Sequence, residues 1–354
     1  MCKKSIFVGA ICLNVLFHIS YIATGYDPIA IAEGRSLKEV FKRVNPSVVV
    51  ILTKEGGYSK SIPNMPIVRT GLGSGIAVSK DGHIMTAAHV VQAADEVYVR
   101  FLDGIQVPAR VVSAAQQADV AMVKLEDLPD NLPIAELGDS DLAETGDEVF
   151  VVGAPYGIEH TLTVGHISGR RKTVGICNEL TPIEFLQTDA GINIGNSGGP
   201  LFSIDGKLIG IVSHILSKSG GSEGLGFAVS INTAKALLID QETFWTGLDA
   251  YLLSGDLAKA LNVPQEAGLL IQHVAVDSFA HRLGLRPSRV PIQIGDSEIF
   301  IGGDILLEVQ GIPVSSSIQE TCRIRDKMGG VERGGYMEVK VLREGRVINL
   351  RAAK

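Results

Sequence analysis

Short apolar segments separated by turn residues fill the chain from about residue 48 to residue 230, and this pattern limits the folds open to it. Asp-Gly pairs stand between neighbouring segments at 81–82, 103–104 and 205–206, and both residue types tolerate the positive φ of hairpin turns. About a dozen short strands with almost no helix predict paired antiparallel β-barrels. The expected strands are Val48–Leu52, Gly73–Val78, His83–Thr86, Glu96–Phe101, Gln106–Ser113, Val120–Leu125, Glu148–Gly153, Thr161–Ser168, Glu184–Thr188, Pro200–Ser203, Lys207–Ser213 and Gly226–Ser230.

A second pattern, in which helical and strand segments alternate, begins near residue 232. Asn232 is predicted to cap a helix from Thr233 to about Gln241. A mixed α+β module follows from about Phe244, and its last hairpin is expected to turn at Glu344-Gly345. The other expected elements are the helices Ser36–Val44, Ser254–Leu261, Phe279–Leu283 and Ser316–Met328, and the strands Gly268–Val276 and Asp304–Val309.

The composition restricts the partners of the protein. A chain of 354 residues with 45% hydrophobic residues suits two or three domains with sizeable cores. The net charge is −7 and no dense stripe of Lys and Arg is present, so nucleic acid is not an expected partner. No His/Cys cluster has metal-ligand spacing, so we expect no metal and no cofactor.

The first 25 residues are predicted to be a targeting segment. Lys3 and Lys4 precede an apolar stretch from Ile6 to Ile22, and small residues follow at Ala23-Thr24-Gly25. A cleaved signal peptide is the favoured interpretation, and an uncleaved N-terminal anchor that associates with the membrane is the alternative. Either predicts an exported protein of the periplasm or cell envelope.

The cysteines add to this assignment. Cys2 and Cys12 lie in the leader, whereas Cys177 and Cys322 fall in different predicted domains. We therefore expect no structural disulfide. An exported protein without disulfides indicates a bacterial envelope.

The segment Gly195-Asn196-Ser197-Gly198-Gly199-Pro200 is the strongest chemical motif. Flanking glycines let the backbone approach a substrate closely, and the N–H groups of Gly195 and Ser197 can converge on a developing oxyanion. One such donor is worth about 2.7–4 kcal/mol in the transition state.

Two further residues complete a candidate catalytic set. His89 ends one apolar strand, Asp119 starts another, and the chain order is His, Asp, Ser. A serine hydroxyl needs a base, so His89 would accept the Ser197 proton while Asp119 holds the imidazole tautomer.

At these residues the chain resembles the HtrA/Deg family of chymotrypsin-fold serine proteases with a C-terminal PDZ domain. The matching segments are Thr86–Val91, Ala118–Leu125, Leu186–Leu201 and Gly224–Val229. The resemblance implies a mostly β protein, with a trypsin-like double six-stranded antiparallel β-barrel over residues 47–242 and an α+β PDZ domain over 243–354. Residues 26–46 would form an N-terminal segment between leader and barrels.

The resemblance also implies a substrate pocket lined by Ile192, Ser213, His214, Ile215 and Phe227, which favours small or medium aliphatic side chains. Gly191 stands where a trypsin-like enzyme carries an acid, so cleavage after Lys or Arg is not expected. His214 departs from the family pattern, and it either narrows the pocket or points away.

In the second domain, Trp245-Thr246-Gly247-Leu248 matches the carboxylate-binding loop of a PDZ domain. A peptide C-terminus would add to the following strand edge, beside the helix from Ser316. Trp245 alternatively packs between the domains. The stretch Pro291–Ile301 is similar to an insertion.

The leading functional hypothesis is ATP-independent proteolysis of unfolded or damaged proteins of the bacterial cell envelope. The alternatives are a chaperone-like or adaptor-like binding protein with low resting proteolysis, and a membrane-tethered regulatory protease. Expected partners are unfolded polypeptides and peptide C-termini, and the resemblance implies a homotrimer or a larger homo-oligomer.

Overall fold

The computed structural model describes residues 36–59, 61, 65–173, 182–241, 243–295, 297–332 and 334–354. The predicted leader, residues 1–25, lies outside this range. Residues 37–354 form one compact unit. Among the described helices, none is both long and apolar enough to span a bilayer.

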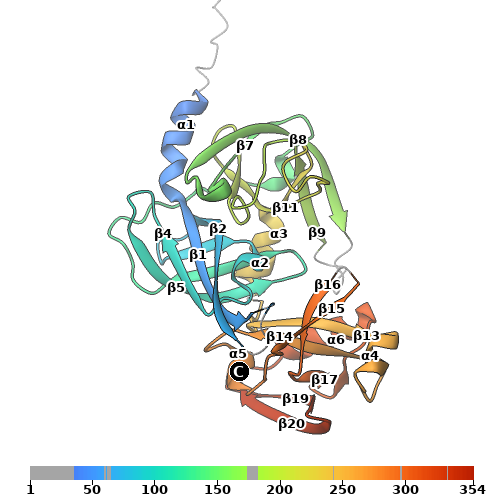
Figure 1. The fold of residues 1–354 in the computed structure, drawn as a ribbon. Helices are drawn as coiled ribbons and strands as arrows, with labels where there is room; N and C mark the ends of the chain where they lie inside the picture. Colours follow the sequence, from blue (N-terminus) through green and yellow to red (C-terminus); the bar gives the residue numbers. More distant parts are fainter. Residues whose placement is uncertain are drawn as a thin grey trace, which may run out of the picture. The chain divides into compact units, whose positions relative to one another are not determined.

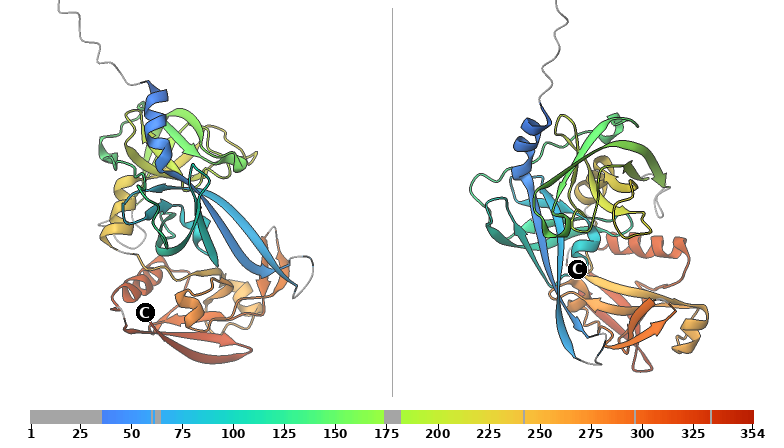
Figure 2. Two further views of the ribbon diagram at one scale, coloured as in Figure 1. Left: turned by 90° about the vertical axis from the view of Figure 1, so that its left-hand side faces the viewer. Right: turned by 45° about the horizontal axis from the view of Figure 1, so that its top comes forward.

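The first six strands close into an antiparallel barrel with the order β1-β2-β3-β6-β5-β4 (Figure 1). Two of them, β3 and β6, have the predicted bounds, whereas β1 and β2 are longer and pair as a ribbon that extends beyond the barrel (Figure 2). The strands are β1 (Val48–Tyr58), β2 (Pro66–Ala77), β3 (His83–Thr86), β4 (Glu96–Arg100), β5 (Gln106–Ala115) and β6 (Val120–Leu125).

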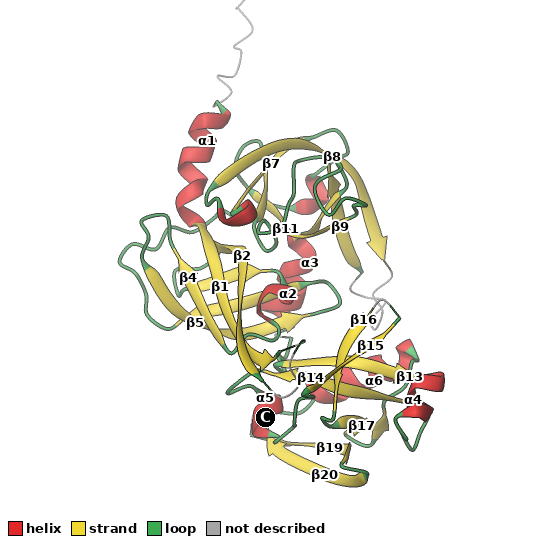
Figure 3. Cartoon of the chain, viewed as in Figure 1, coloured by secondary structure: helices red, strands yellow, loops and turns green. Residues whose placement is uncertain are grey.

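The next six strands close a second barrel with the order β10-β11-β12-β9-β8-β7. They are β7 (Glu148–Gly153), β8 (Thr161–Thr173), β9 (Ile183–Thr188), β10 (Pro200–Ser203), β11 (Leu208–Ile215) and β12 (Gly226–Ser230). Strands predominate over helices in both barrels (Figure 3). The predicted double six-stranded barrel is therefore confirmed.

One apolar cluster joins the two barrels. Ile76 and Met85 of the first barrel pack in the same cluster as Phe150, Phe202 and Ile211 of the second, and all five are fully buried. Burial of one such side chain is worth roughly 1.5–3 kcal/mol, so the junction between the barrels is a rigid core. Residues held at this junction are fixed relative to one another.

Helices α1 (Leu37–Val44) and α3 (Ile231–Lys235) pack against this cluster through Val40, Val44 and Ala234. The expected cap of α3 was wrong. The Ser230 side chain, not that of Asn232, accepts the Thr233 N–H. Asn232 instead donates to Asp139, because helix formation begins at Ile231, two residues earlier than we expected.

The C-terminal module is an antiparallel sheet with β13 at one edge and β20 at the other, in the order β13-β14-β17-β19-β20. Glu344 and Gly345 both have positive φ, as the predicted β19–β20 turn requires. The expected insertion forms the hairpin β15 (Val290–Ile294) and β16 (Ser297–Ile301). The remaining elements are β13 (Leu248–Ser254), β14 (Ala267–Val274), β17 (Ile305–Val309), β18 (Ile312–Pro313), β19 (Tyr336–Arg343), β20 (Arg346–Ala353), α4 (Gly255–Ala260), α5 (Phe279–Arg282) and α6 (Ile318–Gly329).

Cys322, a buried residue of α6, is disulfide-bonded, which overturns the expectation that the protein has no structural disulfide. The other three cysteines lie outside the described residues, so its partner is not assigned. Our prediction failed because sequence separation and domain assignment do not determine the distance between two sulfur atoms in a folded chain.

Candidate active site

His89 and Asp119 form a hydrogen-bonded pair on the first barrel. His89 lies on the one-turn helix α2 (Ala88–Val91), which follows β3, and Asp119 immediately precedes β6, the strand that pairs with β3. The His89 Nδ1 lies 2.9 Å from both Asp119 carboxylate oxygens, and the His89 backbone N–H donates to Oδ1 at 3.0 Å. The carboxylate thus holds both the ring and the backbone of the histidine.

Asp119 occupies a strained turn, because its φ is +55° and the residue is not glycine. Its N–H donates to the Gln116 carbonyl, which closes the turn between β5 and β6. Burial alone would raise the pKa of Asp119, but hydrogen bonds from His89 and Ser213 outweigh this effect and lower the pKa below its ordinary value. The carboxylate is therefore ionised at neutral pH.

Ser213 connects Asp119 to the serine loop. Its hydroxyl donates to Asp119 Oδ2 at 2.6 Å, and its carbonyl accepts the Ser197 hydroxyl at 3.3 Å. No hydrogen bond joins Ser197 to His89 among the described residues. The three predicted residues are therefore brought into one site, with the Ser197 hydroxyl turned toward the Ser213 carbonyl.

The loop that carries Ser197 depends on glycine at two positions. Gly195 has φ +103°, and a Cβ there would lie 2.1 Å from the Ala154 carbonyl oxygen. Gly198 has φ +82°, and a Cβ there would lie 2.2 Å from Thr86 Oγ1. Only glycine allows these close approaches, the first within the second barrel and the second between the barrels. Within the described part of the chain, the N–H groups of Gly195 and Ser197 have no hydrogen-bond acceptor, as an anion-binding pair requires.

Ser74 positions the same loop, and our sequence analysis did not identify it. Its N–H donates to the Ser197 carbonyl at 2.8 Å, and its fully buried hydroxyl donates to the Gly195 carbonyl at 2.7 Å. The same hydroxyl accepts the Ala154 N–H at 3.0 Å. The glycine-rich segment around Ser74 was the available signal, but a serine in an apolar strand does not reveal contacts made 121 residues away.

The structure places the residues of the predicted substrate pocket in two separate groups. Ile192 and Ile215 belong to the interior cluster of the second barrel, and Ile192 Cδ1 lies 2.5 Å from where a Cβ of Gly226 would be. His214 and Phe227 instead stack on each other, with ring centroids 5.1 Å apart and an interplanar angle of 14°. Neighbouring side chains on a strand point to opposite faces, so His214 points away from the face of Ile215. Of the two placements expected for His214, the side chain thus takes the one that points away from Ile215, and it stacks on Phe227.

The C-terminal module contains an apolar groove of about 410 Å³ between the edge strand β13 and helix α6. Thr246 and Leu248 of the predicted carboxylate-binding loop line it, together with Leu269, Ile318 and Ile324. As an edge strand, β13 pairs only with β14, and the Leu248 carbonyl at its start accepts the Gln92 side-chain N–H at 3.0 Å.

Trp245 does not line this groove. Its Nε1–H donates to the Gln92 carbonyl at 3.2 Å, and the ring packs against the core cluster of the first barrel. Of the two roles that we considered for Trp245, packing between the domains is the one observed. A polar tip that satisfies a backbone carbonyl makes tryptophan well suited to such a contact.

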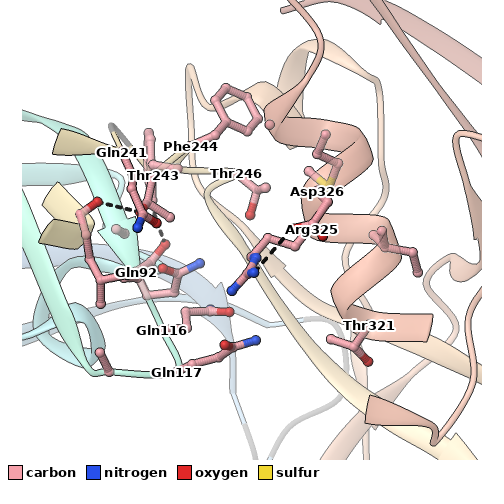
Figure 4. A pocket seen from close by; sticks show the side chains of 18 of the residues that line it. Gln92, Gln116, Gln117, Gln241, Thr243, Phe244, Thr246, Thr321, Arg325 and Asp326 are labelled. Carbon is pink, nitrogen blue, oxygen red and sulfur yellow. Dashed lines mark hydrogen bonds and ion pairs between the residues drawn. The ribbon is translucent and has the colours of Figure 1, made fainter. Parts of the chain in front are cut away.

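A second cavity, of about 510 Å³, lies between the first barrel and the C-terminal module. Gln92, Gln116 and Thr246 line it, and Arg325 extends from α6 into it (Figure 4). The lining turn 114–118 directly precedes Asp119. This cavity therefore borders the turn that leads into Asp119.

Two closed six-stranded barrels with a histidine, an aspartate and a serine at their junction define the class of trypsin-like serine peptidases. In agreement, residues 73–211 match the family of trypsin-like peptidase domains. The chain belongs to the HtrA/DegP-like family of these proteases.

Similar proteins support this assignment. A solved structure of the HtrA-type protease AlgW with a decapeptide is 30% identical, covers 90% of this chain and 98% of that one, and gives a TM-score of 0.51. The structure of AlgW with a tripeptide is 31% identical, covers 90% of this chain and 96% of that one, and gives a TM-score of 0.50.

Two curated relatives are named probable periplasmic serine endoprotease DegP-like. The Halomonas elongata protein is 39% identical over 284 residues, which cover 78% of this chain and 55% of the relative. The Pseudomonas fulva protein is 32% identical over 311 residues, which cover 84% of this chain and 60% of the relative. The chain thus spans little more than half the length of these two relatives.

Proposed function

We propose that this protein is a serine endopeptidase that degrades unfolded or damaged proteins of the bacterial cell envelope without ATP. The observation that carries the proposal is the double contact of Ser213, whose hydroxyl binds Asp119 and whose carbonyl binds Ser197. It brings nucleophile, base and carboxylate to one place at the barrel junction. The periplasmic names of the relatives support the localisation.

In the proposed mechanism, His89 takes the Ser197 proton as the hydroxyl attacks the peptide carbonyl, and returns it to the leaving amine. Asp119 fixes the His89 tautomer through Nδ1 and stabilises the imidazolium. The N–H groups of Gly195 and Ser197 receive the oxyanion, and water hydrolyses the acyl-enzyme.

A second candidate function is a binding protein with low resting proteolysis. The orientation of the Ser197 hydroxyl toward the Ser213 carbonyl favours it, since rotation toward His89 has to precede attack. The family resemblance to oligomeric proteases supports a homotrimer or a larger homo-oligomer. A regulatory protease tethered to the membrane by an uncleaved leader is the third candidate function.

The Ser197→Ala variant tests the proposed activity directly. We expect degradation of an unfolded model protein, followed by gel densitometry, to fall at least about 10³-fold relative to the wild type, because the acyl-enzyme cannot form. Equal degradation by the two proteins would eliminate the protease proposal. Capture of the unfolded protein by both, with no cleavage by either, would favour the binding protein.

We further propose that residues 243–354 act as a PDZ domain that binds peptide C-termini along β13. The apolar groove beside this edge strand and the bound peptides of the AlgW structures support the proposal. The backbone of residues 245–248 would receive the peptide carboxylate, with the Trp245 ring directed away into the barrel contact.

A lysine at position 318 should weaken peptide binding about tenfold. Ile318 lines the groove and is 58% exposed, so the substitution removes an apolar contact without disturbing the core. Binding is measured by fluorescence anisotropy with a labelled decapeptide that has valine as its last residue and a free C-terminal carboxylate. The control is Val347→Lys on β20, the opposite sheet edge, where the side chain is 51% exposed. Equal losses in both variants would refute the assigned groove.

A further inference from the structure

His214 is hydrogen-bonded to the candidate active site through Ser213. Its Nδ1 lies 2.9 Å from the Ser213 hydroxyl oxygen, which is itself 2.6 Å from Asp119 Oδ2. An ionised carboxylate only accepts hydrogen bonds, so the single hydroxyl proton of Ser213 must point to Asp119. The Ser213 oxygen then accepts from His214, and Nδ1 must carry a proton.

This arrangement determines the tautomer of His214. A neutral ring with a proton on Nδ1 leaves Nε2 without one, and a second proton on Nε2 makes the ring a cation. The ring is held in place by Phe227, on which it stacks, and by Phe185, which meets it edge-on with centroids 5.6 Å apart. These contacts leave part of the His214 ring exposed, so water can also reach it.

The charged groups around His214 act in opposite directions. Asp119 favours the cation, whereas His89 opposes it. Arg171 of β8 is engaged elsewhere, because it donates to Gln187, the residue opposite Phe227 on β9. Burial is the main cause that lowers the pKa of His214 below its ordinary value, so the ring is neutral at pH 7.

We propose that His214 is a positioning residue for the hydrolytic reaction: its Nδ1–H holds the Ser213 hydroxyl toward Asp119, which in turn binds the His89 ring. The Ser213 hydroxyl connects the His214 ring to the carboxylate that His89 binds directly. A cation at His214 therefore competes with the imidazolium that His89 must form as it accepts the Ser197 proton. The kinetic part of this inference rests on the proposed peptidase function. The structural part, which concerns the His214 tautomer and its bond to Ser213, does not depend on that function.

The structural part is tested by nitrogen NMR of the imidazole groups in protein labelled with ¹⁵N-histidine, with His214→Asn used for assignment. We expect neutral His214 in the wild type to carry its proton on Nδ1, and to shift toward the Nε2–H form in Ser213→Ala, where the acceptor is gone. An Nε2–H tautomer in the wild type would overturn the proposal, whether or not the protein cleaves peptides.

The kinetic part uses two replacements. Phenylalanine at position 214 keeps the aromatic stack but removes the donor, so kcat at pH 8 should fall about fivefold, the factor expected for one hydrogen bond. Asparagine keeps an N–H near the Nδ1 position, so kcat should stay within about twofold. In the Ser213→Ala background His214→Phe should cause no further loss, because the contact is already absent.

The pH profile separates positioning from simple packing. As the pH falls, the wild type should lose kcat/KM more steeply than His214→Asn, because only the wild type gains a positive charge at position 214. The surface control His281→Phe should match the wild type. A wild type with no activity would refute the peptidase proposal. An active wild type whose pH profile matches that of His214→Asn, or a His214→Phe variant with wild-type kcat, would refute this inference.

Discussion

Asparagine in place of Asp119 should lower kcat for peptide hydrolysis by about 10⁴-fold, with little change in KM. The carboxylate accepts three donors, the His89 ring, the His89 backbone N–H and the Ser213 hydroxyl. An amide nitrogen in its place donates instead of accepting and carries no charge. The His89 ring would lose its enforced tautomer, and the imidazolium would lose its counter-charge.

Initial rates on a quenched fluorescent peptide at several concentrations measure this effect. The matched control is Asp139→Asn, the same chemical change at an aspartate that bonds Asn232 and the Asp141 N–H away from the site. We expect this control to retain wild-type kcat. An Asp119→Asn variant that keeps more than about a tenth of the wild-type rate would show that another group orients His89.

Alanine at position 195 should reduce kcat by about 10²–10³-fold, the loss expected when one oxyanion donor is displaced. The added Cβ would lie 2.1 Å from the Ala154 carbonyl oxygen, and φ is +103°. The Ala154 carbonyl oxygen belongs to the backbone, so it cannot move aside as the end of a flexible side chain can. The Gly195 N–H must therefore turn away from the position it shares with the Ser197 N–H.

The control for this substitution is Gly104→Ala. Gly104 has a similar φ of +85°, but nothing lies within 4 Å of the added Cβ. It isolates the backbone strain, about 1–2 kcal/mol, from the steric clash. Activity should be unchanged in Gly104→Ala, and thermal unfolding of both variants reports their folded fraction. If folded Gly195→Ala hydrolyses peptide at the wild-type rate, the N–H of Gly195 is not an oxyanion donor.

The strands of both barrels were predictable because their signals are local. The segments at β3, β6, β7, β10 and β12 have the predicted bounds, since apolar runs and turn residues determine them within a few neighbours along the chain. The errors arose where partners are distant. The edge strand β13 was not recognised as a strand, and the cap of α3 was assigned to Asn232 although the Ser230 hydroxyl fills that position.

The substrate pocket and the disulfide show the same limit. The predicted pocket residues His214 and Phe227 stack on each other, and the bulge between Val212 and His214 affects which side chains share a face. Cys322 was expected to be reduced because its predicted domain holds no other cysteine. Neither a bulge nor a disulfide partner has a local sequence signal.

By itself the sequence determined the two barrels and the C-terminal module, and it predicted Ser197, His89 and Asp119 as the candidate catalytic set, because hydrophobic period, turn chemistry and motif order act over short stretches of chain. Only the tertiary structure decided how these residues are held. The Ser74 bond to Gly195 and the Ser213 bond to Asp119 join residues that are 121 and 94 positions apart in sequence. Such contacts depend on the packing of one barrel against the other, which no local pattern records.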